Sequence, residues 1–146
     1  MSNMDIFGIV GSALDAQNQR MGAIASNLAN VDSITPPGQQ PYRAHEVVFS
    51  AAPVADGEDD GTASASGPDA GVQVVDTVQS NAEPVRKYDP SSPDADSTGY
   101  VTGSNVSQAE QMVDLIDSSN SYSASVAVLQ QASRVDQQII SSFQVT

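Results

Sequence analysis

Hydrophobic positions near the N-terminus recur with a period of seven residues. One line of this heptad contains Phe7, Leu14, Met21 and Leu28, and the other contains Val10, Gln17, Ile24 and Val31, with Gln17 as its polar member. Alternating spacings of three and four residues place side chains on one narrow stripe of a helix, as in helices that pair in coiled coils. The pattern predicts a long helix over about residues 5–30.

A second, less regular stripe lies toward the C-terminus. It contains Leu115, Tyr122, Val126, Leu129, Ile140 and Phe143, and polar residues interrupt it at Ser119, Ser133 and Asp136. Ser107 followed by Glu110 forms a capping-box pattern, with Asn105 as the alternative cap, so we expect a final helix from there to about residue 143. Two separate stripes that each need an apolar partner indicate a chain built to assemble.

Between the two stripes the chain reads as turns, short strands and polar loop. Prolines within residues 33–41 end the first helix, because proline lacks a backbone donor and disfavours helix before it. Residues rich in valine and aromatic side chains predict strands over residues 42–49, 72–78, 85–88 and 100–102. Residues 50–70 are small, polar and acidic, and we expect a mobile acidic loop there.

The sequence therefore predicts an α+β fold with three regions. They are an N-terminal helix in residues 1–33, a β-rich middle region in residues 34–104 and a C-terminal helix in residues 105–146. At 146 residues the chain is one modest domain at most, and its middle is too polar to bury a large core. Cysteine is absent, so neither disulfides nor thiolate metal sites hold the fold.

The charge balance narrows the classes of partner. A net charge of −13 argues against nucleic acid and against anionic membrane surfaces, because both need a basic face. The cations are one lysine and four arginines: Lys87, Arg20, Arg43, Arg86 and Arg134. No segment reaches the ~20 apolar residues of a membrane span, and the start of the chain lacks the basic region of a secretory signal. We expect a protein that is cytosolic or leaves by a route that does not read these signals.

Candidate chemistry is sparse. His45 is the single histidine, and we interpret it as a strand-surface residue beside Glu46. No nucleophile elbow, phosphate loop or dinucleotide fingerprint is present, so we expect neither an enzyme nor a cofactor, and we assign no catalytic or cofactor-binding residue.

Residues 94–99 form an acidic stretch that resembles the first half of a calcium-binding loop. Asp94 and Asp96 precede Gly99 with alternating oxygen side chains, but position twelve of such a loop would be Asn105, which cannot give a bidentate carboxylate. The competing interpretation is an Asx-type turn, in which Asp94 and Asp96 bond nearby backbone amides between two strands. We favour the turn and assign no metal site, while a calcium-dependent binding module stays an alternative.

Two segments carry a resemblance to a known family. Residues 25–33 resemble the N-terminal motif of bacterial flagellar axial proteins, the rod and hook subunits, and residues 88–101 are similar to a segment of the C-type proximal rod subunits. Residues 42–49, 71–74, 112–116 and 121–122 extend the likeness, which covers essentially the whole chain outside residues 50–70. The motif residues are Ser26, Asn27, Leu28, Ala29, Asn30, Tyr88, Asp89, Pro90, Pro93, Asp94, Asp96, Gly99 and Tyr100.

The chain also departs from that family's pattern. Residues 33–41 form a longer link than usual after the first motif, and Ser104 stands where proline is expected before the last helix. Asn120, Ser123 and Ser125 occupy positions where charged side chains are common.

The resemblance implies an architecture and a function. The two terminal helices would pack as an axial coiled coil through Phe7, Val10, Leu14, Met21, Ile24, Leu28, Leu115, Tyr122, Val126, Leu129 and Ile140. Asn27 and Asn30 would satisfy backbone or neighbouring subunits at the helix end, or simply cap it. The implied protein is a structural subunit of the periplasm-spanning flagellar rod, the drive shaft that transmits torque from the motor ring to the hook.

The resemblance also implies the partners. They are other copies of the chain, other rod subunits, the membrane-ring and rod-base adaptor proteins, and the flagellar type III export apparatus, which would export the chain without a cleaved signal peptide. A secreted helical filament protein, or a paralogue recruited outside the rod, is the alternative.

Overall fold

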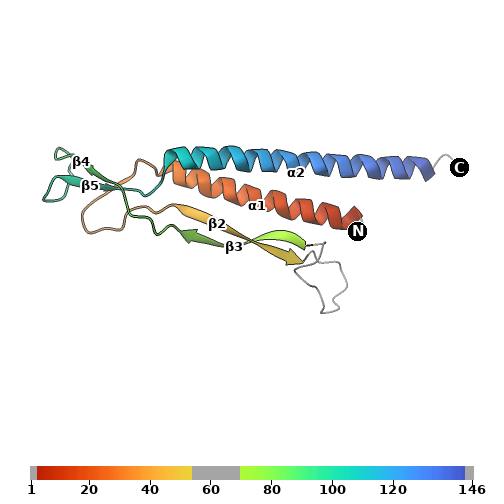
Figure 1. The fold of residues 1–146 in the computed structure, drawn as a ribbon, viewed down its shortest axis with the longest axis horizontal. Helices are drawn as coiled ribbons and strands as arrows, with labels where there is room; N and C mark the ends of the chain where they lie inside the picture. Colours follow the sequence, from red (N-terminus) through yellow and green to blue (C-terminus); the bar gives the residue numbers. More distant parts are fainter. Residues whose placement is uncertain (1–2, 54–69, 144–146) are drawn as a thin grey trace. The chain divides into compact units, whose positions relative to one another are not determined.

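The computed structural model describes residues 3–53 and 70–143 (Figure 1). In chain order the elements are α1 (Asn3–Ala29), β1 (Ile34–Thr35), β2 (His45–Pro53), β3 (Ala70–Gln79), β4 (Arg86–Tyr88), β5 (Tyr100–Gly103) and α2 (Gln108–Phe143). The fold is α+β, as the sequence predicts, with the helices at the two ends of the order and two small sheets between them. No helix within the described ranges is long and apolar enough to cross a bilayer.

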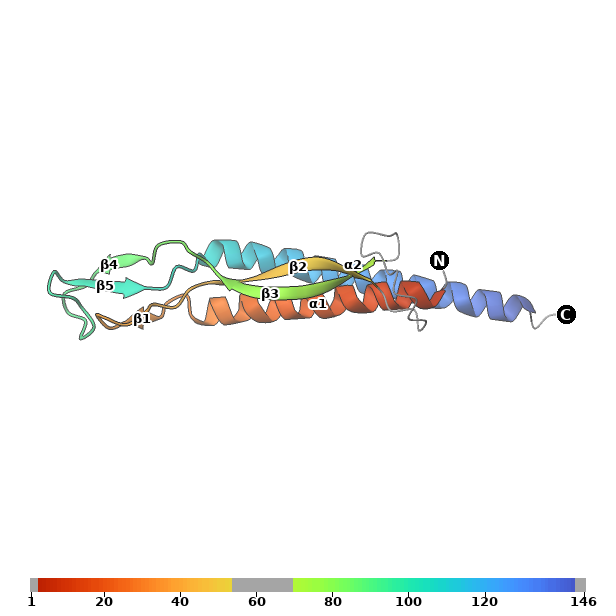
Figure 2. The same ribbon diagram turned by 90° about the horizontal axis from the view of Figure 1, so that it is seen from below.

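The chain forms two compact units, and each is built from separated stretches of sequence. The first combines Met1–Gln19, Phe49–Val75 and Ser118–Thr146, and the second combines Arg20–Val48 and Asp76–Asp117. Each long helix therefore contributes one part to each unit. The strands β2 and β3 pair with each other as a two-stranded sheet and lie side by side in both views (Figure 1 and Figure 2).

The first unit is held together around the N-terminal part of α1. Val10 and Ala16 are buried there, with 8% and 3% of their surface exposed. The start of β3 is tied to the helix, because the Val72 backbone N–H donates to Ser12 Oγ over 3.1 Å. Ser118 of α2 is fully buried, and its Oγ has no hydrogen-bond partner among the described residues. Ser118 is not one of the predicted interruptions of the stripe, and the neighbouring Ser119, which is one of them, is exposed.

The second unit contains a three-stranded antiparallel sheet in the order β1-β5-β4. Ile34 stands opposite Gly103 across the β1–β5 pair, while Lys87 stands opposite Val101 across the β4–β5 pair. Val101 is 2% exposed and is the central apolar residue of the sheet. Other buried apolar residues of this unit are Ile24, Ala44 and Val106.

The helix boundaries agree closely with the sequence-based prediction, and the caps explain why. Ser107 rather than Asn105 caps α2, since the Glu110 N–H donates to Ser107 Oγ over 3.5 Å and the Gln111 N–H donates to the Ser107 carbonyl over 3.0 Å. At the other helix end, Asn30 donates from Nδ2 to the Ser26 carbonyl over 2.8 Å, which satisfies one of the last free acceptors of α1.

The strand predictions need correction. β2 begins at His45 rather than residue 42 and continues to Pro53, so residues 50–53 belong to a strand and not to the expected loop. β3 is longer than expected at both ends, and the short strand β1 was not predicted at all. A two-residue strand carries no periodicity, and Ile34–Thr35 pairs only with the distant β5. The acidic part of the expected loop, around residues 58–60, lies outside the described residues.

Residues 89–99 connect β4 to β5, and the conformation of this connection depends on Gly99. Its φ of +80° lies in the left-handed region, and a Cβ built there would stand 3.0 Å from Tyr88 Cε2 and 3.3 Å from Pro90 Cβ. The Gly99 N–H donates to the Asp96 carbonyl, and the Gly99 carbonyl accepts from the Asp89 N–H, both over 3.0 Å. Glycine is the residue that tolerates both the dihedral and the contact.

Replacing Gly99 with alanine tests this account. We expect Gly99→Ala to lower the free energy of unfolding by about 2 kcal/mol, because a left-handed Cβ and a crowded ring both oppose it. Gly38→Ala is the matched control, since Gly38 has a φ of +88° with nothing within 4 Å of its built Cβ, and should cost about 1 kcal/mol. Urea unfolding measures both, and equal losses would show that the Tyr88 contact is irrelevant.

Candidate functional site

The most connected polar side chain of the second unit is Asn27, on the last turns of α1. It is 1% exposed and bonded on both sides of its carboxamide. Nδ2 donates to the His45 carbonyl over 2.9 Å and to Gln111 Oε1 over 2.8 Å. Oδ1 accepts from the His45 N–H over 2.8 Å and from the Tyr42 hydroxyl over 3.1 Å. Two donor hydrogens and two lone pairs are all used, so Asn27 joins α1 to the start of β2 and to the first turns of α2.

Tyr42 and His45 extend this network from the segment before β2. The Tyr42 hydroxyl lies 3.0 Å from His45 Nδ1 and 3.1 Å from Ser26 Oγ, and the two rings are tilted with centroids 5.4 Å apart. Because the hydroxyl hydrogen points to Asn27 Oδ1, the bond to His45 requires a hydrogen on Nδ1 of the imidazole. His45 is therefore a half-buried member of a structural network rather than a simple strand-surface residue.

A second asparagine, Asn105, connects three segments just before α2. Its Oδ1 accepts from the Ala44 N–H over 2.7 Å, and its Nδ2 donates to the carbonyls of Ser80 and Ala82 over 3.2 and 3.0 Å. Ser104 beside it is 2% exposed and donates from Oγ to the Val31 carbonyl over 2.7 Å. The serine at the position where proline is expected thus holds the segment that follows α1 against the segment between β5 and α2.

Charged contacts reinforce the same junction more weakly. Arg20 of α1 lies 3.5 Å from a carboxylate oxygen of Asp114 and 3.9 Å from one of Asp117, both on α2. The three side chains are 30–66% exposed, so water and salt screen these pairs. These ion pairs help to orient α1 against α2, while the buried hydrogen bond between Asn27 and Gln111 contributes more to the stability of the contact.

The β4–β5 turn is organised by Asp96, as the Asx-turn interpretation predicts. Its Oδ1 accepts from the backbone N–H groups of Thr98 and Tyr100 over 2.8 and 3.0 Å, and its Oδ2 accepts from Arg86 over 2.7 Å. The Thr98 hydroxyl bond is the largest cause that lowers the pKa of Asp96 from 3.8 to about 2.

The prediction was wrong for the other aspartate of this stretch. The bond formed at Asp94 runs from its backbone N–H to Ser92 Oγ over 3.3 Å, and its carboxylate accepts no hydrogen bond within the part of the chain that the structure describes. Asp89 fills the role expected of Asp94, because its carboxylate accepts from the N–H and the hydroxyl of Ser91, and that hydroxyl lowers the pKa of Asp89. Within the described ranges no three metal-ligating side chains form a cluster that could hold an ion.

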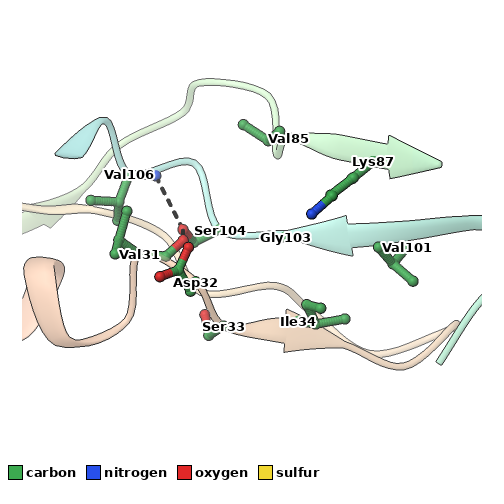
Figure 3. Close-up of a pocket in the computed structure, with 10 residues that line it drawn as sticks. All are labelled: Val31, Asp32, Ser33, Ile34, Val85, Lys87, Val101, Gly103, Ser104 and Val106. Carbon is green, nitrogen blue, oxygen red and sulfur yellow. Dashed lines mark hydrogen bonds between the residues drawn. The ribbon is translucent and has the colours of Figure 1, made fainter. Parts of the chain in front are cut away.

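A cavity of about 360 Å³ lies between β1, β4, β5 and the segment that follows α1 (Figure 3). Val101 and Val106 are its buried apolar residues, at 2% and 7% exposure, while Ile34 and Val85 line it at 47% and 59% exposure. Lys87 extends from β4 over the cavity, and Asp32 lies beside Ser104 at another part of the lining (Figure 3). The cavity therefore combines a mainly apolar lining with one amino group and one carboxylate.

The residues expected to pack between helices differ in exposure. In α1, Val10 and Ile24 are buried, and Phe7, Leu14, Met21 and Leu28 are half-buried. In α2, Leu115, Tyr122, Val126 and Leu129 are half-buried, whereas Ile140 is 59% exposed. Their part in subunit packing stays a prediction.

The motif residues of the turn are more exposed. Tyr88 and Tyr100 are 63% and 40% exposed, and their rings meet edge to face with centroids 5.2 Å apart. The Arg86 guanidinium carbon lies 5.1 Å from the centroid of Tyr100. The turn thus presents a small aromatic surface beside an arginine that is paired with Asp96.

Sequence reasoning missed Gln111 and the linking role of Asn105. Gln111 stands four residues before Leu115, so extending the second stripe by one turn toward the N-terminus would have placed it on the helix-facing side. Asn105 carries no such signal, because its partners Ala44 and Ser80 are distant in sequence.

Comparison with known families agrees with the resemblance noted in the sequence. Residues 9–36 match the family model described as flagella basal body rod protein, and residues 97–142 match the model described as flagellar basal body rod FlgEFG protein C-terminal. The first match contains Asn27, and the second contains Asn105 and Gln111. Both halves of the amide network therefore fall in the matched regions.

Curated relatives cover most of the chain. The flagellar basal-body rod protein FlgC of Escherichia coli O6:H1 is 47% identical over 131 residues, which is 88% of this chain and 89% of that protein. The FlgC protein of Salmonella typhimurium is 43% identical over 129 residues, again with 88% and 89% covered. The FlgC protein of Bacillus subtilis is 32% identical over 138 residues, with 88% and 90% covered.

Removing the Asn27 carboxamide tests the network. We expect Asn27→Ala to lower the free energy of unfolding by about 3 kcal/mol, because it leaves Gln111 Oε1 and both backbone groups of His45 without their partner. Asn30→Ala removes one exposed bond to the Ser26 carbonyl and should cost less than about 1 kcal/mol. Urea unfolding compares the two variants, and similar losses would contradict a central role for Asn27.

The Asp96 turn predicts an acid-sensitive hairpin. Because the folded pKa of about 2 lies below the ordinary 3.8, the contribution of this carboxylate is present above pH 3.8 and is lost as the pH falls through about 2. Thr98→Val should move the Asp96 carboxyl midpoint, followed by NMR, upward toward 3.8, since it removes the main stabilising hydroxyl. Ser97→Ala should leave the midpoint in place, and an unchanged midpoint in Thr98→Val would refute the assignment.

Proposed function

The chain belongs to the FlgC family of flagellar basal-body rod proteins, and from this premise we propose that it polymerises into the proximal rod that transmits torque from the motor ring to the hook. It is a structural subunit of the basal-body rod, and its relatives are named as rod proteins rather than enzymes. The observation that carries the proposal is the 47% identity over 88% of the chain.

We propose that α1 and α2 pair as an axial coiled coil. The heptad spacing of the first stripe supports this, because such spacing keeps one seam facing a partner helix. In the second unit the bond from Asn27 to Gln111 and the ion pair from Arg20 to Asp114 both join the two helices. The buried Ile24 lies between these two contacts along α1.

Apolar side chains exposed on α2 supply surfaces for neighbouring subunits. In the second unit Met112, Val113 and Ile116 are 48%, 66% and 62% exposed, and in the first unit Val128 and Ile139 are 52% and 44% exposed. Fully burying a side chain of this size contributes about 1.5–3 kcal/mol, so several of them could drive polymerisation. Ile140, exposed in the single chain, joins this set more readily than an internal seam.

The partners and the location follow from a rod role. We assign as partners other copies of this chain, other rod subunits, the adaptor proteins at the membrane ring and the flagellar type III export apparatus. The site of action is the part of the rod that crosses the periplasm, reached by export without a cleaved signal peptide.

Purified basal bodies from the source organism test the proposal. We expect mass spectrometry to find this chain as a stoichiometric component, and deletion of its gene to abolish rods and swimming. A complementing copy should restore both. Basal bodies that contain a different C-type subunit and lack this chain would refute the rod role and favour a paralogue recruited elsewhere.

A further inference from the structure

We propose that the cavity between β1, β4 and β5 receives the first turns of α2 from a second copy of this chain. The inference rests on the proposed function, because it names one contact by which subunits would assemble. Cavity and helix segment both belong to the second unit, so the chemistry of each surface is defined within one body.

The cavity offers an apolar floor with a cation beside it. Val101 and Val106 are its buried apolar lining residues, and the exposed Ile34 and Val85 widen the apolar area available to an incoming side chain. A volume of about 360 Å³ is at the small end of the range for binding cavities, which suits side chains of a docked helix.

Lys87 sets the charge that the occupant should carry. It forms no ion pair within 4.0 Å among the described residues, whereas Arg20 and Arg86 are each paired with aspartates of the same chain. Its charge does contribute to lowering the pKa of Asp89, which follows β4. Asp32 lines another part of the cavity, so a carboxylate would be attracted toward Lys87 and repelled from Asp32.

The start of α2 presents the complementary surface. Glu110, Val113 and Ile116 follow one another at three-residue spacing, so they share one side of the helix. Val113 and Ile116 are 66% and 62% exposed, and Glu110 is exposed at the N-terminal end of the same side. A carboxylate followed by an apolar pair is the chemistry that Lys87 and the cavity together would hold.

Every copy of the chain carries both the cavity and the complementary side of α2. A second copy can therefore supply the helix that the cavity of the first copy would receive. A contact between unlike surfaces is heterologous, and repeated it extends a helical assembly instead of closing a dimer. Chains with a net charge of −13 repel one another, so a contact that sets a lysine against a glutamate is favoured over contacts between acidic faces.

A charge exchange tests the pairing of Lys87 with Glu110. In cells that lack their own copy, Lys87→Glu and Glu110→Lys should each lower the yield of rod-containing basal bodies about tenfold, because like charges then face each other. The double variant should recover to within about twofold of the parent. Single variants that assemble normally, or a double variant no better than the worse single one, would overturn the proposal.

Cysteine cross-linking tests the contact directly, since the chain has no cysteine of its own. Two chains, one with Ile34→Cys and one with Val113→Cys, are expressed together, and their basal bodies are oxidised. We expect a disulfide-linked dimer only when both chains are present. Ile34→Cys paired with Gln137→Cys, an exposed position later on α2, is the matched control and should give none.

The outcomes separate this inference from the rod role. Chains present in basal bodies without the dimer would overturn the contact and leave the rod role intact, as would a disulfide to a different rod protein. Chains missing from all basal bodies, the unsubstituted parent included, would overturn the rod role and the contact with it. Val85→Cys with Met112→Cys repeats the test at a second exposed pair if the first substitutions fail to assemble.

Discussion

The carboxamide of Asn27 is the interaction on which the second unit depends. Its four hydrogen bonds reach His45 at the start of β2, Tyr42 before it and Gln111 in the first turns of α2. Segments 15–84 residues apart in sequence meet at one side chain, which is itself 1% exposed. Each buried polar group left without a partner costs about 1–3 kcal/mol. Arrangements that break the Asn27 hydrogen bonds are therefore disfavoured.

Asn105 and Ser104 continue the same principle along the sheet. Asn105 bonds to the backbone of Ala44 and Ser80, and Ser104 bonds to the carbonyl of Val31. These residues immediately follow β5, so the contacts that hold the helix ends also hold the strand that lines the cavity. Hydrogen bonds from small polar side chains therefore hold the segments of this unit together, a role that a larger apolar core has in other domains. The middle region has too few apolar residues to form such a core.

Sequence patterns predicted the helices and the turn between β4 and β5, because residues close together in the chain determine these elements. The two helices follow from heptad spacing and from Ser107 as a cap, and the turn follows from Asp96 with Gly99. The strand limits did not follow, because β2 begins where Asn27 and Asn105 take up the backbone groups of His45 and Ala44. Nor could the sequence place the cavity, since β1 lines part of it and pairs with β5, whose partner residues lie 67 and 69 positions later in the chain.

A subunit of an assembly must stay separate from other copies until it is incorporated and must then bind its neighbours. The net charge serves the first requirement, and the exposed apolar side chains serve the second. The charge of −13 keeps free copies apart, but its reach is limited to about 10 Å at ordinary salt. Exposed residues such as Val113 and Ile116 act only in direct contact, where each buried side chain contributes about 1.5–3 kcal/mol. Repulsion thus dominates between separated copies, and apolar burial dominates where two surfaces come into direct contact.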